Sequence, residues 1–286
     1  MLRKSCMKIK LVIVMALWGS LGVFSRSIEL SSVAMSFYRA MFALPILLFA
    51  MKRQKVTLAS LWVKQMIPMA VSGVLIGGAW VLFFVGFRLT SVANVTLLYN
   101  LCPMYVMLLS PWVLKAKNRW IQWVTILVSF VGMIMIVFQS LSLPDSEGLG
   151  LFVATLSGFM YAVIVLINRK YSVDFPGVSV AFVQLVFAGL VLLPLVLFQR
   201  ESLGSINSVI SLILLGVVHT GIAYIWYFDS YKVFNAATIA QVTYLDPLFS
   251  IIFAYFIAFE PLSLVQMFGG ILILGSSFVG LRLKQV

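Results

Sequence analysis

The sequence predicts an all-α integral membrane protein, and three observations lead to this fold class. Hydrophobic side chains make up 63% of the 286 residues and charged ones only 10%, with a mean hydropathy of +1.11. Soluble domains carry about 25% charged residues. The apolar residues form runs of about twenty, the length of a helix that crosses a hydrocarbon core of about 30 Å. Short alternating segments typical of an outer-membrane barrel are not seen, so we expect helices throughout.

Ten apolar runs are long enough to cross a membrane. The first follows a basic stretch that resembles a signal peptide in charge. Because no small-residue cleavage site followed by a soluble domain is seen, we expect this run to stay as a helix. Short loops join the runs, which predicts antiparallel neighbours. The predicted spans are Ile9–Ser27, Ser31–Met51, Val63–Phe87, Ser91–Leu114, Ile121–Gln139, Leu149–Asn168, Val178–Phe198, Ile206–Phe228, Ala236–Phe259 and Ser263–Leu283.

The basic residues lie at the ends of the apolar runs. The net charge is +12, but this distribution is typical of a membrane protein and unlike the basic face of a nucleic-acid-binding domain. Of the 20 Lys and Arg residues, sixteen fall in the N-terminus, the C-terminus and every second loop. Since basic loops stay in the cytoplasm, we expect a multi-pass protein of the cell membrane with both termini cytoplasmic. The expected surroundings are a lipid bilayer, and nucleic acid is not an expected partner.

The second half of the sequence repeats the first at an offset of 144 residues. We therefore expect two domains, residues 1–144 and 145–286, each with five helices. An odd number of helices makes the halves enter the membrane from opposite sides, as in the inverted repeats of secondary transporters. The alternative is a chance alignment of apolar helices. The aligned pairs are Gly77 with Gly221, Ala79 with Ala223, Trp80 with Tyr224, Arg88 with Lys232, Ala93 with Ala237, Leu101 with Leu245, Pro103 with Pro247 and Gln122 with Gln266.

Several short motifs resemble those of a known family. They are LWGS at Leu17–Ser20, the run Phe37-Tyr38-Arg39, and two small-residue-rich segments that lead into a proline, Ser91–Pro103 and Ala236–Pro247. With ten spans in two halves, the chain resembles the drug/metabolite transporter superfamily, EamA-type branch, over nearly its whole length. The resemblance implies a ten-helix basket of two five-helix bundles. It also implies movement of small metabolites by alternating access, frequently outward, and says little about the substrate.

Aromatic side chains are the first candidates for a solute-binding cavity. On ideal helices Tyr224 shares a stripe with Gly221, and Trp80 shares one with Gly77, where small residues allow close helix approach. The same spacing predicts that Trp226 and His219 lie on the opposite face from Tyr224. Ordinary packing is the alternative for these rings. A ring of aromatics that could hold an aromatic or quaternary-ammonium solute comprises Trp18, Trp80, Tyr161, Tyr224 and Tyr244.

Polar side chains in the fourth and ninth runs are the second group of candidates. Gln241 and Tyr244 share a face with Thr238, and the repeat pairs this face with Asn94 and Asn100. Polar groups that face hydrocarbon without partners cost several kcal/mol, so we expect both faces to point into the bundle or a wet cavity. The alternative role is interhelical hydrogen bonding that only joins helices.

Two charged residues, Arg39 and Asp246, lie well inside predicted spans, away from their ends. Asp246 lies about 160° from Tyr244 on an ideal helix, so both line one cavity only if the helix deviates, and Pro247 is a reason for deviation. A buried carboxylate there could bind a proton or cation, attract a cationic substrate, or simply form an ion pair or cap. Arg39 could meet a substrate carboxylate, reach the outer interface, or pair with Asp246 or with carbonyls. A coupling proton is therefore a candidate partner.

These features together predict a secondary transporter for a small organic metabolite, such as an amino acid or a related amphipathic compound, in the export direction. The main alternative is an importer of a quaternary-ammonium or other cationic solute held in an aromatic cage. A membrane enzyme and a non-transporting scaffold are further alternatives. No GxxxxGK[ST], HExxH or nucleophile-elbow motif occurs, so we expect no ATP drive, no catalytic residues, no metal and no cofactor. The oligomeric state is left open.

Overall fold

The computed structural model describes residues 2–21, 24, 28–56, 66–138, 148–199, 201, 203–259 and 263–282. The described residues form helices and no strands, so the all-α prediction is confirmed. The predicted span ends at Ser27, Val63, Gln139 and Leu283 lie outside the described residues. The helices are α1 (Leu2–Gly19), α3 (Ser32–Arg53), α4 (Met66–Leu89), α5 (Val92–Tyr99), α6 (Cys102–Leu114), α7 (Trp120–Val137), α8 (Gly148–Tyr171), α9 (Gly177–Gln199), α10 (Ile206–Leu214), η3 (Leu215–Ile222), α11 (Ala223–Ser230), α12 (Ala236–Val242), α13 (Leu245–Ala258) and α14 (Leu264–Arg282).

Nine helical segments in the described part of the chain are long and apolar enough to cross a membrane. They correspond to the second to tenth predicted spans. The first predicted span corresponds to α1, which starts seven residues earlier than predicted (Leu2 rather than Ile9) and includes Arg3, Lys4, Lys8 and Lys10. Because of these charges α1 is not one of the nine, and its membrane crossing stays a prediction.

Three of the predicted spans are not single α-helices. The fourth is broken between α5 and α6 at Asn100–Leu101, and the ninth between α12 and α13 at Thr243–Tyr244. The deviation that we predicted at Pro247 therefore begins before the proline. Pro103 and Pro247 lie in the first turns of α6 and α13. A backbone N–H in the first turn has no acceptor within the helix, so proline costs no hydrogen bond there. The eighth span contains η3, a π-helix between α10 and α11.

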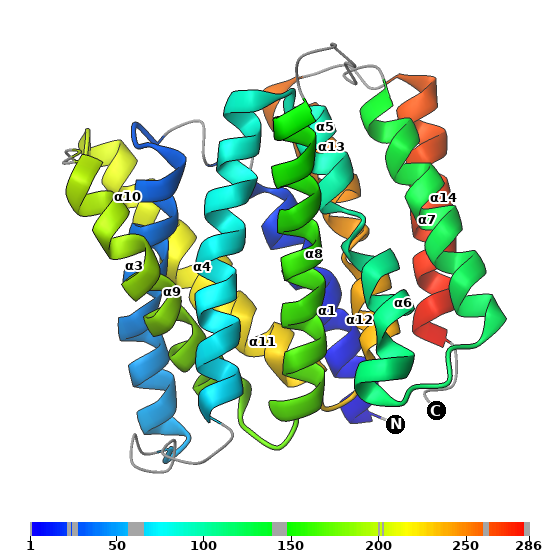
Figure 1. Cartoon of the computed structure of the whole chain (residues 1–286), viewed down its shortest axis with the longest axis horizontal. Helices are drawn as coiled ribbons and strands as arrows, with labels where there is room; N and C mark the ends of the chain where they lie inside the picture. Colours follow the sequence, from blue (N-terminus) through cyan, green and yellow to red (C-terminus); the bar gives the residue numbers. More distant parts are fainter. Residues whose placement is uncertain are drawn as a thin grey trace.

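The helices pack side by side in a bundle, and Figure 1 shows that α1 begins and α14 ends on the same side. We call this the termini side. Helix α4 packs against α8 and α9, while α3 packs against α9 and η3. At one end of the bundle α7 and α14 form a close pair (Figure 1). A Cβ on Gly132 would lie 2.6 Å from the carbonyl oxygen of Gly269, so this contact requires glycine.

Candidate functional site

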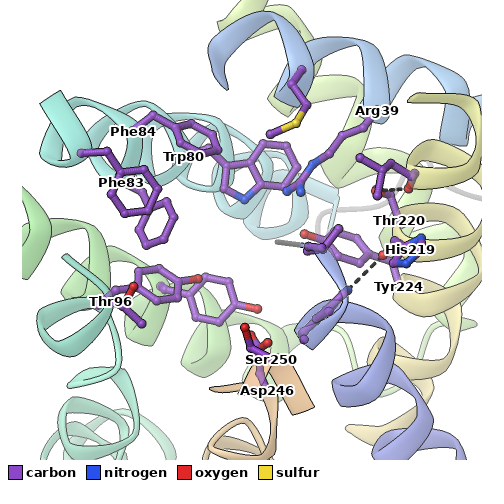
Figure 2. Close-up of a pocket in the computed structure, with 18 residues that line it drawn as sticks. Arg39, Trp80, Phe83, Phe84, Thr96, His219, Thr220, Tyr224, Asp246 and Ser250 are labelled. Carbon is purple, nitrogen blue, oxygen red and sulfur yellow. Dashed lines mark hydrogen bonds between the residues drawn. The ribbon is translucent and has the colours of Figure 1, made fainter. Parts of the chain in front are cut away.

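A cavity of about 440 Å³ lies between the helices near the centre of the bundle. Its wall consists largely of aromatic side chains and includes a few charged groups, as Figure 2 shows. Residues from both predicted domains contribute. The lining residues are Trp18, Gly19 and Leu21 of the α1 region, Met35 and Arg39 of α3, Trp80, Phe83, Phe84 and Phe87 of α4, Thr96 and Tyr99 of α5, Tyr161 of α8, Leu215, His219 and Thr220 of η3, Tyr224 of α11, and Asp246 and Ser250 of α13.

The cavity lies toward the side of the bundle opposite the termini. Helix α1 starts on the termini side and contributes only its far end, Trp18 to Leu21. Helix α3 runs back from the opposite side and contributes Met35 and Arg39 from its first two turns. Helix α4 contributes residues from Trp80 onward, in its second half. Any path from the cavity to the termini side therefore runs through the packed half of the bundle.

Edge-to-face ring contacts hold the aromatic wall together. The rings of Trp18 and Tyr224 lie 5.7 Å apart at an interplanar angle of 75°. Across the cavity Phe83 packs against Tyr99 with centroids 4.8 Å apart, and Tyr99 packs against Tyr161 at 5.5 Å. Aromatic pairs favour such edge and tilted arrangements. Rings contributed by several helices are thereby fixed as flat surfaces for a solute.

Arg39 lies on the upper wall of the cavity in Figure 2, with its guanidinium over the ring of Trp80. Its Cζ is 4.1 Å from the ring centroid, which is within cation–π range. The Nε atom is buried without a hydrogen-bond partner, and no ion pair links Arg39 to a described residue. Pairing with Asp246, one of the alternatives given for Arg39, is not seen. The guanidinium is therefore held by stacking and keeps its donors available.

Asp246 lies on the opposite wall in Figure 2, in the first turn of α13. Within the described part of the chain its carboxylate accepts no hydrogen bond and joins no ion pair. The backbone of this turn packs closely on α1, because a Cβ on Gly19 would lie 2.7 Å from the carbonyl oxygen of Asp246. A glycine is needed there to bring α1 against α13. Its carboxyl group lines the cavity and has no counter-charge among the described residues.

His219 lines the cavity together with Tyr224, so the predicted opposite-face position was wrong. The reason is the π-helix, whose i→i+5 bonds bring residues five apart onto one face. Figure 2 shows His219 beside Tyr224. The imidazole Nε2 lies 2.9 Å from Ser20 Oγ, and the indole Nε1 of Trp18 donates to the His219 carbonyl at 3.0 Å. The π-segment is thus tied to α1.

Six of the predicted site residues meet at the cavity, and four lie elsewhere in the bundle. Asn94 Nδ2 in α5 donates to Oγ1 of Thr90, which lies between α4 and α5, at 2.9 Å. Asn100 Nδ2 donates to the Thr96 carbonyl at 2.8 Å. Gln241 lies between α7 and α14. Its Nε2 donates to the Ser276 carbonyl at 2.7 Å, and its Oε1 accepts from Thr125. The six at the cavity are Trp18, Arg39, Trp80, Tyr161, Tyr224 and Asp246.

Tyr244 also lies outside the cavity wall. It is fully buried and its hydroxyl donates to the Asn100 carbonyl at 3.1 Å. The geometry of these amides and of Tyr244 favours the alternative of hydrogen bonds that join helices or satisfy freed backbone groups. The predicted cavity position of Tyr244 was therefore wrong, whereas Asp246, about 160° away on an ideal helix, lines the cavity. Gly221 packs against Ile46 of α3 and is likewise absent from the wall.

Sequence reasoning missed several lining residues. Phe83 and Phe87 lie three and seven positions after Trp80, so the helical spacing of α4 could have found them. Thr96 and Tyr99 line the cavity from the turn before the break in α5, and Ser250 follows Asp246 by one turn of α13. Finding these requires the directions of the broken helices, which the residue spacing alone does not give.

A bundle of apolar helices around a cavity with charged and aromatic walls defines the chain as a polytopic membrane protein with an internal cavity. The sequence profile described as the EamA-like transporter family matches residues 7–138 and again residues 148–281. The chain therefore belongs to this family of the drug/metabolite transporter superfamily.

Similar proteins agree with this membership. An uncharacterized transporter, YxxF, of Bacillus subtilis (strain 168) is 29% identical over 288 residues, which covers 99% of this chain and 91% of that protein. An S-adenosylmethionine uptake transporter of Rickettsia prowazekii is 25% identical over 60% of this chain and 57% of that protein. One crystal structure has the same fold with a TM-score of 0.86 at 18% identity, covering 96% of this chain and 97% of that one.

Proposed function

We propose that this membrane transporter moves a small organic solute of the amino-acid kind, bound in the central cavity and carried by alternating access. The observation that supports this most is the pair of opposite charges in one aromatic cavity. Arg39 and Asp246 both line the wall, and they form no ion pair with each other. The enzyme alternative has less support because the family and the relatives are named transporters, and the scaffold alternative because the interior of the bundle contains a cavity.

A charge count favours a zwitterionic solute. Charges inside a membrane protein are costly unless each has a partner. A solute with only an anionic group would leave Asp246 unpaired, and a solute with only a cationic group would leave Arg39 unpaired. A solute that carries both a carboxylate and an ammonium group supplies a partner for each. The planar guanidinium suits a carboxylate, which it can bind through two parallel hydrogen bonds.

The size and walls of the cavity are compatible with such a solute. Its volume of about 440 Å³ lies within the range of small-molecule sites. Trp80, Phe83 and Tyr161 offer flat apolar surfaces beside the two charges. An amino acid or a related amphipathic compound with an aromatic or apolar part would use both features. We propose export as the direction, as the family resemblance implies. We place both termini in the cytoplasm, following the distribution of basic residues.

Two inverted five-helix repeats form part of this proposal. They are supported by the two matches to the family profile, which cover corresponding halves of the chain. The broken helices add support, because the break at Asn100–Leu101 recurs 144 residues later beside Tyr244. Secondary transporters with inverted repeats bind their solutes between the halves and alternate access by rocking one half against the other. The cavity, lined from both halves, has the position expected for such a site.

Import of a cationic solute is a second candidate. It is favoured by the aromatic cavity wall and by the relatives named S-adenosylmethionine uptake transporters in Rickettsia prowazekii and Rickettsia conorii. S-Adenosylmethionine carries a sulfonium cation in addition to its amino-acid end. Aromatic faces bind such cations through their quadrupoles. This candidate uses the same cavity and differs in the solute and in the direction of movement.

Counterflow in proteoliposomes tests transport itself. Purified protein is reconstituted into liposomes loaded with a mixture of unlabelled metabolites, and labelled L-phenylalanine or S-adenosylmethionine is added outside. We expect saturable accumulation of the labelled amino acid, abolished when no internal solute is present. Accumulation of S-adenosylmethionine alone would favour the second candidate. Chemical conversion of the solute without accumulation would contradict transport and favour an enzyme.

A further inference from the structure

A column of four rings lies below the cavity on the termini side. Three of the rings, Tyr224, Tyr227 and Phe228, belong to α11, and the fourth, Tyr231, directly follows this helix. Tyr224 packs on Phe228 with centroids 5.3 Å apart, and Tyr227 packs on Tyr231 at 5.4 Å. All four side chains are buried, with at most 6% of their surface exposed. We call this set the ring column.

The ring column begins at the cavity and leads away from it. Tyr224 belongs to the cavity wall, while Tyr227, Phe228 and Tyr231 do not. Helix α11 runs on toward the termini side, where Phe234 is fully buried after its end. The hydroxyl of Tyr231 donates a hydrogen bond to the hydroxyl of Tyr227 at 3.1 Å, so these two buried hydroxyls are partners of each other. The column therefore fills the interior between the cavity and the termini side.

Contacts at both ends fix the ring column in this position. At its upper end, Trp18 packs its ring on Tyr227 at 5.0 Å and donates to the carbonyl of His219. At its lower end, Asp229 Oδ1 accepts from the backbone N–H of Gly177 at 2.9 Å and pairs with Lys232 at 3.2 Å. The ring contact ties α11 to α1, and the Gly177 hydrogen bond ties it to the start of α9, whereas the Asp229–Lys232 pair is local (i,i+3). These two contacts are non-covalent, so they can break without a chemical step.

The π-helix directly before α11 provides a place where this helix can change direction. A π-helix has wider turns than an α-helix and often occurs at functional sites. Gly216 and Gly221 lie within η3 and pack on α3, where a Cβ would come within 2.5 Å of Phe42 and of Ile46 respectively. The segment is therefore held against α3 while α11 continues beyond it. η3 is therefore anchored on α3, while α11 after it is held by a different set of contacts.

We propose that α11 is the gate on the termini side: its ring column closes the cavity there, η3 is the hinge, and the hydrogen bond from Gly177 to Asp229 is the latch. This inference rests on the proposed transport function, because a gate has a purpose only if a solute passes. The structure then represents the state that is closed on the termini side. Opening requires the latch to break and the ring column to leave the interior.

Side-specific labelling of a cysteine in the cavity tests the gate without any solute. Cys6 and Cys102 are replaced by serine, and Ser250→Cys is introduced into the cavity wall. A membrane-impermeant maleimide is added to one side of proteoliposomes, and a protein that keeps the exposed Cys6 reports the termini side. We expect labelling of Ser250→Cys from the opposite side and protection from the termini side.

Variants of the latch and the ring column should remove this protection. Asp229→Ala should raise the labelling rate from the termini side by about tenfold, since it removes the charge-assisted hydrogen bond that joins α11 to the start of α9. Tyr231→Ala should do the same, while Tyr231→Phe, which keeps the ring, should change it less. Asp174→Ala is the matched control, because this exposed carboxylate lies in the loop before α9 and has no partner among the described residues.

The proposal is overturned if Ser250→Cys is labelled from the termini side in the otherwise unchanged protein. It is also overturned if Asp229→Ala and Tyr231→Ala label like Asp174→Ala. If Tyr231→Ala does not fold, the labelling rate of Asp229→Ala alone tests the proposed gate. Failure of transport in counterflow leaves the labelling pattern readable, so a wrong function and a wrong gate give different results.

Discussion

The hydroxyl of Tyr244 donates a hydrogen bond to the main-chain carbonyl of Asn100 at 3.1 Å, and the two residues are 144 positions apart in the chain. Each lies at the break of a helix pair, between α12 and α13 and between α5 and α6. A break frees carbonyl groups that have no intrahelical donor, and in a membrane such groups need a partner. The two breaks therefore touch, and one supplies the donor that the other lacks.

Tyr244→Phe should destabilise the protein and leave solute binding largely unchanged. The variant keeps the buried ring but leaves the Asn100 carbonyl without this donor, which costs about 1–3 kcal/mol for a buried group. The unfolding transition of the purified protein in detergent measures the loss. Tyr255→Phe is the control, because Tyr255 is 45% exposed on α13. Equal stability of the two variants would contradict the role given to this hydrogen bond.

Arg39→Gln should weaken the binding of a carboxylate-bearing solute by about 10- to 100-fold, the cost of losing a hydrogen bond to a charged group. Arg39→Lys should recover only part of this, because an ammonium group lacks the planar fork and stacks poorly on Trp80. Equilibrium binding to the purified protein measures both. Arg53→Gln on the same helix is the control, since Arg53 is exposed beyond the cavity. A loss of the same size in Arg53→Gln would refute this assignment.

Asp246→Asn should weaken the binding of a solute with an ammonium group and remove the pH dependence of that binding. Protonation of Asp246 at acid pH removes the negative charge that the ammonium needs, so binding to the unmodified protein should fall as pH falls. The amide side chain of the variant has no charge at any pH, so its weak binding should stay flat. Binding isotherms over a range of pH measure both proteins. If binding to the unmodified protein rises at acid pH, Asp246 takes up a coupling proton with the solute instead.

Trp80→Ala and Tyr224→Ala should each weaken solute binding more than Trp226→Ala. Both rings belong to the cavity wall, whereas Trp226 does not and has the amine of Lys10 over its ring at 5.6 Å. Truncation of an aromatic that contacts a ligand costs about 1–3 kcal/mol, or about 5- to 150-fold in affinity. Binding isotherms of the three variants give the comparison. Equal losses in all three would mean that the cavity wall is not the binding surface.

Gly269→Ala should loosen the pairing of α7 with α14. A methyl group there would meet the carbonyl of Gly132 and the Cβ of Met135, and such overpacking costs about 1–3 kcal/mol. Gly275→Ala on the same helix is the matched control, because nothing lies within 4 Å of its added Cβ. Thermal unfolding in detergent should show a lower transition for the first variant only. Two equal transitions would contradict the tight contact.

The membrane spans and part of the cavity could be predicted from the sequence because the relevant periodicities are regular. The thickness of the bilayer fixes the length of an apolar run, and helical spacing along α4 is undisturbed at Trp80. His219 was assigned to the wrong face because the π-helix changes the rotation per residue, and no motif in the sequence marks it. Tyr99 was missed because the direction of α5 depends on the break that follows it.

The amides show a second limit of prediction from sequence. Asn94, Asn100 and Gln241 all have hydrogen-bond partners, as the cost of unpaired polar groups requires. Water in a cavity and hydrogen bonds to other helices can both satisfy these polar groups. Gln241 forms hydrogen bonds with Thr125 and Ser276, which belong to helices distant in the sequence. Only the tertiary packing separates the two outcomes, and here it favours the second.

The most direct test of the central claim compares three solutes of similar size in counterflow. The solutes are L-phenylalanine with both charges, N-acetyl-L-phenylalanine with only the carboxylate, and L-phenylalanine amide with only the ammonium group. If Arg39 and Asp246 each bind one charge, the zwitterion should accumulate at least about tenfold faster than either analogue, since each analogue leaves one charge unpaired. Equal rates for the zwitterion and either analogue would contradict the account.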